Sequence, residues 1–468
     1  MHSTMSHYTR LRRAFARAHI DLRYEDGVYT VRNEAAQATI LLPASLPLEE
    51  KAVRQLLAFA SVRTPDGGAA VCSACATPDF HPGAIAPVGS VVATPSDVVI
   101  PAAIGTDINC GMRLMSTGLS LGQLAPRQSE LIEGLKRVIL DNGRNVPTPT
   151  QAFKALFDDG PLAFVDRLQP DGLWARVNRQ RVAAEVERCI GLAQLRGHSR
   201  HAHESFVSGR DIIRDPCLGT PGAGNHFVEL QVVDAVLDRH AAYELGLRVG
   251  DVAVMIHSGS RDMGFHVGTR WMDRARAAWP RGVRHPESQL YALAGPLAAE
   301  YLDAMGVAAR YAWANRVVLG ELVRAELVRI FDADDARLLV DVPHNVILCE
   351  QGLNLHRKGA TPANAGQLAL IPGSMGDSSY VARGLGHPDW LWSCSHGAGR
   401  RIRRQELRRL QPRASHDEEW RCVTLREERR IEEAPEAYKP IGPVIEAQTE
   451  AGLIEAVVKL RPWVTFKA

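Results

Sequence analysis

The sequence lacks a long apolar run, and this excludes one class of protein. Among its 468 residues, no uninterrupted apolar stretch reaches the roughly 20 residues that a transmembrane helix needs. The N-terminal region carries Arg10, Arg12, Arg13 and Arg17 but no apolar segment followed by small residues, so we expect no secretory signal. We therefore predict a cytoplasmic protein with no membrane partner.

The chain also lacks a strong excess of one charge and a pattern of paired cysteines. Its formal net charge is +2, whereas a protein that binds nucleic acid over its whole surface is usually more basic. Any site for a polyanion must therefore be local. The 8 cysteines are scattered, and Cys72 and Cys75 have no second pair at zinc-ribbon spacing. We interpret the cysteines as reduced thiols and this pair as structural.

Apolar residues are plentiful, at 46% of the chain, which is typical of a folded protein with a large core. β-branched or alternating runs predict strands at residues 28–31, 38–42, 98–100, 456–460 and 463–466. Helical spacing predicts helices at residues 47–62, 131–139, 180–195 and 297–330. Because strands and helices mix without regular alternation, we predict an α+β fold with mixed sheets and peripheral helices.

Several short segments carry side chains that bind metals. Asp107 and Cys110 lie in a glycine-flanked turn, and three histidines each stand beside an apolar run or a glycine-rich turn: His226, His257 and His344. Taken singly, each has an ordinary interpretation as a buried thiol or a satisfied core histidine. Together these five residues could fill the coordination shells of two metal ions.

Other segments have the composition of phosphate-binding loops. Residues 219–227 contain three glycines, whose peptide N–H groups can cradle a phosphate. Residues 370–379 are rich in hydroxyls and free backbone amides. In residues 395–400, small neighbours leave room for a phosphorus centre to approach the ring of His396. The alternative for this last segment is a glycine-rich turn ahead of a basic helix.

Ten segments occur in an order that resembles the RtcB family of RNA ligases. They are PDFH, GTDINCGMRL, GTPGAGNHF, HSGSR, VPHN, HRKGAT, IPGSMGDSSYV, SHGAGR, EAPEAYK and RPWVTFK. The likeness begins near Pro78 and is much weaker before it. It implies a variable N-terminal segment, residues 1–65, followed by a single large catalytic domain of this type, residues 66–468.

The resemblance also implies roles for residues. Cys110 would bridge two manganese ions, with Asp107 and His226 completing one shell and His257 and His344 the other. Ligand softness alone would favour zinc, so manganese rests on the resemblance. His396 would be the catalytic nucleophile that GTP guanylylates. Contacts with the guanine nucleotide are implied for Asn225, His226, Phe227, Val228, Glu229, His344, Asn345, Pro372, Gly373, Ser374, Met375, Ser379, His396, Gly397, Ala398, Gly399 and Lys467.

The implied activity is GTP-dependent joining of an RNA 3′-phosphate or 2′,3′-cyclic phosphate end to a 5′-hydroxyl end. It would proceed through an RNA(3′)pp(5′)G intermediate, in RNA repair or tRNA splicing. Departures from the family pattern suggest a divergent branch: Ala103, Asn109, Pro221, Pro362, Asn364 and a cysteine at 394 rather than directly before His396. Two alternatives stay open, a dinuclear metal-dependent phosphoesterase acting on RNA ends and a non-catalytic paralogue that binds them.

A basic run follows the implied nucleophile. Seven arginines lie between Arg400 and Arg413, and Ile402, Leu407 and Leu410 have the spacing of an inward helix face. A solvated basic face is the ordinary interpretation. Because substrate phosphates must pass nearby, we expect Arg400 to contact the nucleotide or the reacting phosphate. The RNA backbone is expected on Arg403, Arg404, Arg408 and Arg409.

Overall fold

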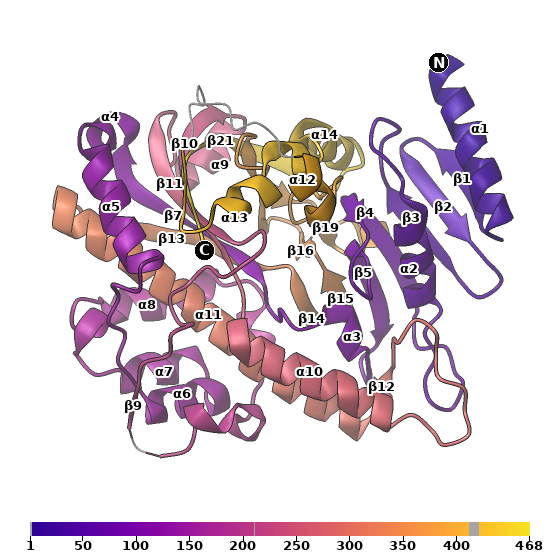
Figure 1. Cartoon of the computed structure of the whole chain (residues 1–468), viewed down its shortest axis with the longest axis horizontal. Helices are drawn as coiled ribbons and strands as arrows, with labels where there is room; N and C mark the ends of the chain where they lie inside the picture. Colours follow the sequence, from indigo (N-terminus) through magenta and orange to yellow (C-terminus); the bar gives the residue numbers. More distant parts are fainter. Residues whose placement is uncertain (1, 210, 411–420) are drawn as a thin grey trace.

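The computed structural model describes residues 2–209, 211–410 and 421–468. Arg413 of the predicted basic helix lies outside this range. Two large β-sheets form the frame of the molecule, and the helices pack around and between them (Figure 1). The α+β prediction is therefore confirmed.

The first sheet has seven strands and includes the N-terminal part of the chain. Its neighbours are antiparallel except for the β3–β4 pair, which is parallel. In spatial order the strands are β1 (Asp21–Glu25), β2 (Val28–Arg32), β3 (Gln37–Leu41), β4 (Ser73–His81), β5 (Val88–Pro95), β15 (Leu353–Lys358) and β14 (Asn345–Glu350). The strands predicted at 28–31 and 38–42 are thus confirmed.

The second sheet has eight strands and contains the C-terminal strand. In order they are β13 (Arg337–Pro343), β7 (Gly111–Ser120), β11 (Asp251–Ser258), β10 (Phe227–Val236), β21 (Ile454–Lys467), β18 (Ser379–Gly384) and β17 (Leu368–Ile371), with β20 (Arg421–Thr424) parallel to β21. The two strands predicted at 456–460 and 463–466 form one strand, β21. The register slips between Leu230 and Gln231 of β10, opposite Pro462, and such an irregularity accommodates a proline in a strand.

Three two-stranded sheets complete the β structure of the described residues. They pair β6 (Val98–Val99) with β12 (Leu293–Ala294), β16 (Ala360–Pro362) with β19 (Ser393–Ser395), and β8 (Thr148–Pro149) with β9 (Ile212–Ile213).

The predicted helices are confirmed in three of four cases. The α-helices are α1 (His2–Arg17), α2 (Glu50–Ala60), α3 (Pro101–Ile104), α4 (Leu121–Leu124), α5 (Gln128–Ile139), α6 (Thr150–Asp158), α7 (Pro161–Arg167), α8 (Arg179–Glu185), α9 (Arg239–Leu245), α10 (Arg261–Ala277), α11 (Pro296–Phe331), α12 (Arg404–Leu410), α13 (Glu427–Glu432) and α14 (Ile441–Glu450). The single helix predicted at 180–195 is wrong, because α8 ends at Glu185. Beyond it the backbone N–H of Ile190 donates to Asp341 of β13, and Gly191 adopts a left-handed conformation.

The longest helix, α11, crosses the molecule beneath the second sheet (Figure 1). It has 36 residues and is buried around most of its circumference. Its middle contributes to the largest hydrophobic cluster, together with α5, α6, α10 and the second sheet. Buried polar residues interrupt this apolar surface, among them Asn315, Arg316 and Arg324. Among the described residues, no helix is long and apolar enough to span a membrane.

The two large sheets meet at their edges. β13 is the outermost strand of the second sheet and β14 is the outermost strand of the first, and only His344 separates them in the chain. In the second sheet, Gly111 at the start of β7 pairs with Pro343 and with Ser258, which end β13 and β11. The start of β10 is next, with Phe227 opposite His257. Four chain segments therefore converge at one corner.

Candidate active site

The five residues expected to bind metal meet at this corner. The Sγ atom of Cys110 lies 3.2 Å from Nε2 of His226 and 3.2 Å from Nε2 of His257. Nε2 of His226 is 3.0 Å from a carboxylate oxygen of Asp107, and Nε2 of His257 is 3.2 Å from Nε2 of His344. The donor atoms thus form a continuous chain with Cys110 near its centre.

Asp107 and Cys110 lie on one tight turn. The N–H of Cys110 donates to the carbonyl of Asp107, and Asn109 adopts a left-handed φ of 56°. Gly111 must lack a side chain, because a Cβ there would lie 2.5 Å from the carbonyl oxygen of Val342. The N–H of His344 donates to the Cys110 carbonyl at 2.8 Å. The turn is therefore fastened to the segment that carries another donor.

Burial sets the charge state of two imidazoles, those of His257 and His344. It lowers the pKa of His257 and of His344 well below the usual value, and neighbouring histidines add to the effect. Both rings are thus neutral near pH 7 and offer lone pairs. Burial acts to raise the pKa of Asp107, but the adjacent His226 outweighs it and the pKa is lowered. A carboxylate, neutral imidazoles and a thiol are a suitable donor set for divalent transition metals.

His396 lies beside this cluster, with its ring centroid 4.8 Å from that of His344. It directly follows β19. Its Nδ1 is 2.5 Å from a carboxylate oxygen of Asp79 in β4, which also accepts the backbone N–H of His396 at 3.3 Å. The other oxygen of Asp79 accepts from the hydroxyl of Thr77. Asp79 is fully buried, so this pair is shielded from water.

The glycines around His396 allow the backbone to approach closely. Gly399 has a φ of +76°, and a Cβ there would lie 2.2 Å from the carbonyl oxygen of Asp79. A Cβ on Gly359 would contact the imidazole itself, at 3.1 Å from Cε1. The N–H of Ala398 donates to the carbonyl of Pro372, which joins this turn to the 372–378 loop.

A cavity of about 520 Å³ connects the cluster, His396 and the glycine-rich loops. Most of the residues expected to contact a nucleotide line it: Asn225, Phe227, Glu229, His344, Asn345, Pro372, Gly373, Ser374, Met375, His396, Gly397, Ala398, Gly399 and Lys467. Three do not. His226 is in the metal cluster, Val228 packs into the core, and the buried hydroxyl of Ser379 accepts from Gln231.

One wall of the cavity carries a buried carboxylate, Glu229. Burial raises its pKa to about 7, against hydrogen bonds from Thr465 and Gln231 and the charge of Lys467, which act to lower it. Burial lowers the pKa of Lys467, against the charge of Glu433. The cavity therefore contains an acid that titrates near neutral pH beside a cation.

The sequence predicted no role for Asp79, although it lies within the PDFH segment. It also gave none to Lys358, which lines the cavity and donates to the Ile104 carbonyl at 2.8 Å. Both contacts join residues more than 250 positions apart. The order of the motifs indicated which segments share a site but not which side chains touch.

Several arginines of the basic run form ion pairs within the protein, which the sequence did not predict. Leu407 is buried as expected. Arg400 and Arg404 pair with the buried carboxylate of Glu433 at 3.0 and 2.9 Å, and Arg408 pairs with Glu432. Arg404 and Arg408 keep about half of their side chains exposed. Arg403 and Arg409 are exposed and have no ion pair with any other described residue.

Comparisons with known proteins agree with this geometry. Residues 56–468 match the family model described as tRNA-splicing ligase RtcB. The RNA-splicing ligase RtcB of Mycobacterium tuberculosis is 37% identical over 426 residues, which cover 83% of this chain and 95% of that protein. The tRNA-splicing ligase RtcB of Pyrobaculum aerophilum is 33% identical over 429 residues, covering 82% and 85%. That of Thermococcus kodakarensis is 32% identical over 431 residues, with the same coverage. The chain belongs to the RtcB family of RNA ligases.

Proposed function

We propose that this protein is a GTP-dependent RNA ligase that joins a 3′-phosphate or 2′,3′-cyclic phosphate end to a 5′-hydroxyl end. The observation that carries the proposal is the Asp79–His396 pair, which opens onto the same cavity as the metal-binding donors. A nucleophile, charge-stabilising groups and space for a nucleotide are thus combined in one place.

Asp79 determines which ring nitrogen of His396 reacts. Because the carboxylate accepts a hydrogen bond from Nδ1, the proton stays there and the lone pair is on Nε2. Nε2 attacks the α-phosphorus of GTP, a P–N bond forms, and pyrophosphate leaves. A 2′,3′-cyclic phosphate end would first be hydrolysed by water to a 3′-phosphate. The GMP then passes to the RNA 3′-phosphate, which restores His396, and the 5′-hydroxyl displaces GMP to make the phosphodiester.

The donor set suits two divalent cations. Cys110 would contact both, Asp107 and His226 would hold one, and His257 and His344 the other. When bound, the cations would spread the charge of the phosphoryl oxygens, which supplies much of the catalysis in phosphoryl transfer. Manganese is proposed only because of the family, since a thiolate with three imidazoles would by itself suit zinc better.

The nucleotide is proposed to lie along the glycine-rich wall. Residues 372–375 and 397–399 line this wall, and its backbone N–H groups, other than that of Ala398, which donates to Pro372, would bind phosphate oxygens. Glu229 and Lys467 lie on the same cavity and would recognise polar groups of the base or ribose. A broken RNA end, with tRNA as one candidate, would enter from the side of Arg403.

Two alternative functions are less well supported. A phosphoesterase would need the metal donors but neither a nucleotide cavity nor a histidine oriented by a buried carboxylate. A non-catalytic paralogue that only binds RNA ends would not need the complete donor set.

The direct test is incubation with α-labelled GTP and manganese, followed by denaturing electrophoresis. The wild type should acquire an acid-labile, alkali-stable label, as expected for a P–N bond. His396→Ala should abolish labelling with metal content near normal. His240→Ala, which changes an exposed histidine on α9, is the matched control and should label fully. Labelling that persists in His396→Ala would place the nucleophile elsewhere, and no labelling of the wild type would favour the alternatives.

A further inference from the structure

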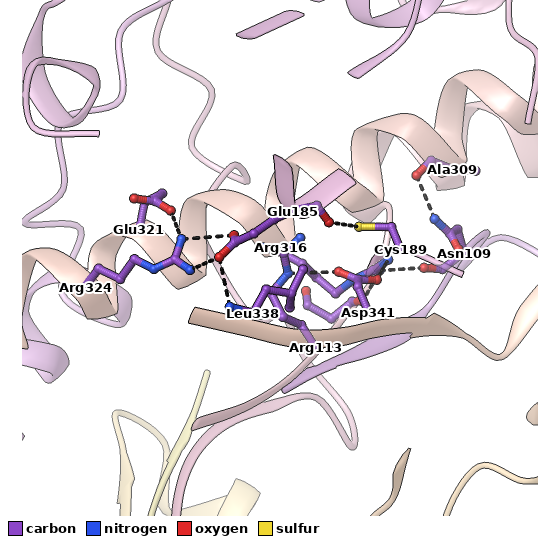
Figure 2. Close-up of polar contacts among 11 residues, drawn as sticks. Asn109, Arg113, Glu185, Cys189, Ala309, Arg316, Glu321, Arg324, Leu338 and Asp341 are labelled. Atoms are coloured by element: carbon purple, nitrogen blue, oxygen red, sulfur yellow. Dashed lines mark hydrogen bonds and ion pairs between the residues drawn. The ribbon is translucent and has the colours of Figure 1, made fainter. Parts of the chain in front are cut away.

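Behind the metal donors, one guanidinium on α11 contacts two of the segments that carry them (Figure 2). Nη1 of Arg316 donates to the carbonyl of Asn109 at 2.8 Å and to the carbonyl of Ser258 at 3.0 Å. These residues stand directly before Cys110 and directly after His257. Arg316 therefore helps to set the separation of two donors whose atoms are 3.2 Å apart.

The rest of the guanidinium binds Asp341, three residues before His344. Nη2 and Nε of Arg316 lie 2.7 and 3.1 Å from its carboxylate. Arg113 of β7 donates to the same carboxylate at 2.9 Å. All three side chains are 1–2% exposed. A planar fork between fixed acceptors leaves little freedom, so the end of β13 is fastened to the same point.

Asn315, the residue before Arg316 in α11, binds the fourth donor-bearing segment, the loop that leads to His226. Oδ1 of Asn315 accepts the N–H groups of Gly219 and Thr220, in the loop that leads to His226. Its Nδ2 donates to the hydroxyl of Ser258 at 2.9 Å. Two consecutive side chains thus bind all four segments that supply metal donors, although neither side chain is itself a donor.

We propose that Arg316 and Asp341 are positioning residues of the metal centre, which hold the donor-bearing segments at the spacing that metal ions require. The inference rests on the metal site proposed above and extends it. Partners that orient ligands typically change metal affinity by roughly 10- to 100-fold when mutated.

The helix offers a matched control for the effect of disturbing a buried arginine. Arg324, also 2% exposed, pairs with Glu185 and Glu321 and donates to the Ala336 carbonyl at 3.1 Å. Figure 2 shows this group further along the same helix. Within the described chain, none of these contacts of Arg324 involves a residue adjacent to a proposed metal donor, so its loss should affect folding and leave the centre intact.

The experiment compares Arg316→Lys with Arg324→Lys in metal-free protein. Lysine keeps the charge but cannot bridge Asp341 and two carbonyls. Cobalt(II) titration, followed by thiolate charge-transfer absorption, and manganese(II) competition against a chelator give the affinity, while thermal unfolding gives the stability. Arg316→Lys should bind metal roughly 10- to 100-fold more weakly with an altered cobalt spectrum. Arg324→Lys should melt earlier but bind metal like the wild type.

The inference is overturned if Arg316→Lys has wild-type affinity and spectrum, or if Arg324→Lys loses affinity to the same extent. Should Arg316→Lys fail to fold, Asp341→Asn replaces it. This change preserves the shape of the side chain but weakens its ion pair with Arg316, and the same loss of metal affinity is expected. Neither GTP nor RNA is used. A protein that binds metal in this way but never labels with GTP would therefore sink the ligase proposal alone, whereas a wild type that binds no metal would overturn both.

Discussion

The position of one ring proton decides what His396 can do. A histidine can attack phosphorus only through an unprotonated nitrogen, and a carboxylate on the opposite nitrogen fixes which one that is. The 2.5 Å contact between Nδ1 and Asp79 provides this constraint inside a buried environment. It also places a negative charge where the ring would become positive during the proposed attack.

Replacing Asp79 with asparagine should therefore slow guanylylation while leaving the metal donors in place. The amide preserves the shape but carries no charge and no longer selects the tautomer. The equivalent change in a serine-protease triad costs a factor of about 10⁴, so we expect a loss on the order of 10²–10⁴. The measurement is the single-turnover rate of label incorporation at saturating GTP, with bound metal quantified in the same sample. An unchanged rate would remove Asp79 from the mechanism.

Glu229 should make nucleotide binding depend on pH near neutrality. Its pKa is raised to about 7 by burial, so the carboxylate ionises as the pH rises through this value. If the ionised form accepts N–H groups of the guanine base, GTP affinity should increase between pH 6 and pH 8. The stability of the free protein should change in the opposite direction. Between about pH 4.5 and pH 7 the folded state retains a proton on Glu229 that the unfolded state releases, so the free energy of unfolding falls as the pH rises.

The matching variant is Glu229→Gln, in which the pH dependence should disappear and GTP should bind more weakly. Calorimetric titration of metal-loaded protein at the two pH values measures this. A pH dependence that survives in Glu229→Gln would assign it to another group.

The sequence predicted which residues belong to the candidate site better than it predicted which side chains contact one another. The five residues proposed to bind metal could be named because a thiol, three imidazoles and a carboxylate could together fill the coordination shells of two metal ions. Asp79 could not be assigned, because its partner lies 317 positions away and an aspartate before a phenylalanine has many ordinary explanations. The same holds for Glu433, whose pairing with Arg400 and Arg404 arises only when α12 and α13 pack together.

At the scale of elements, periodicity identified helices and strands but could not determine where tertiary pairing would end them. The helix expected at 180–195 is α-helical only to Glu185; a 3-10 turn follows at Val186–Arg188, and the N–H of Ile190 then bonds to β13. The strands expected at 456–460 and 463–466 are one strand, because an irregular register with β10 accommodates Pro462 between them. In both cases the deciding hydrogen bonds come from a strand remote in sequence.

The packing of α12 against α13 also divides the arginines expected to bind RNA. Arg404 and Arg408 pair with buried glutamates, and removing them would leave each carboxylate with one arginine fewer, Glu433 with Arg400 and Glu432 with Arg429. Arg403 and Arg409 are exposed and can be changed without that penalty. We expect Arg403→Gln with Arg409→Gln to preserve folding and GTP labelling but to weaken RNA binding across sequences.

The diagnostic measurement is the slope of log affinity against log salt. Each lost contact with single-stranded RNA should reduce its magnitude by roughly 0.7. Arg404→Gln with Arg408→Gln is the comparison and should additionally lower thermal stability. If the first pair leaves the slope unchanged, these arginines form a solvated surface and the RNA follows another path.

Considered as a whole, the molecule builds its site where two sheets share an edge. His344 lies in the connection between β13 and β14, the outermost strands of the two sheets, and the metal donors gather on one side of it. His396 follows β19 of the small β16–β19 sheet, and Asp79 of β4 in the first large sheet holds its ring. Each half of the chemistry is thus supplied by a different part of the frame, and one cavity joins them.

This arrangement leads to a prediction about which RNA end supplies the phosphate at the new junction. Because His396 would pass GMP to a phosphate already on the RNA, the protein should activate a 3′ end and should not join a 3′-hydroxyl to a 5′-phosphate. The junction phosphate should therefore derive from the 3′ end. RNA labelled at its 3′-phosphate, sealed to a 5′-hydroxyl partner and then digested, should retain the label at the junction.

His396→Ala should give no product from the same ends, yet it should seal a substrate supplied as preformed RNA(3′)pp(5′)G, because that substrate no longer needs the nucleophile. A junction phosphate that originates from the 5′ end would refute the proposed reaction, whereas failure of His396→Ala on the preactivated RNA would show that this histidine has a second task in the sealing step.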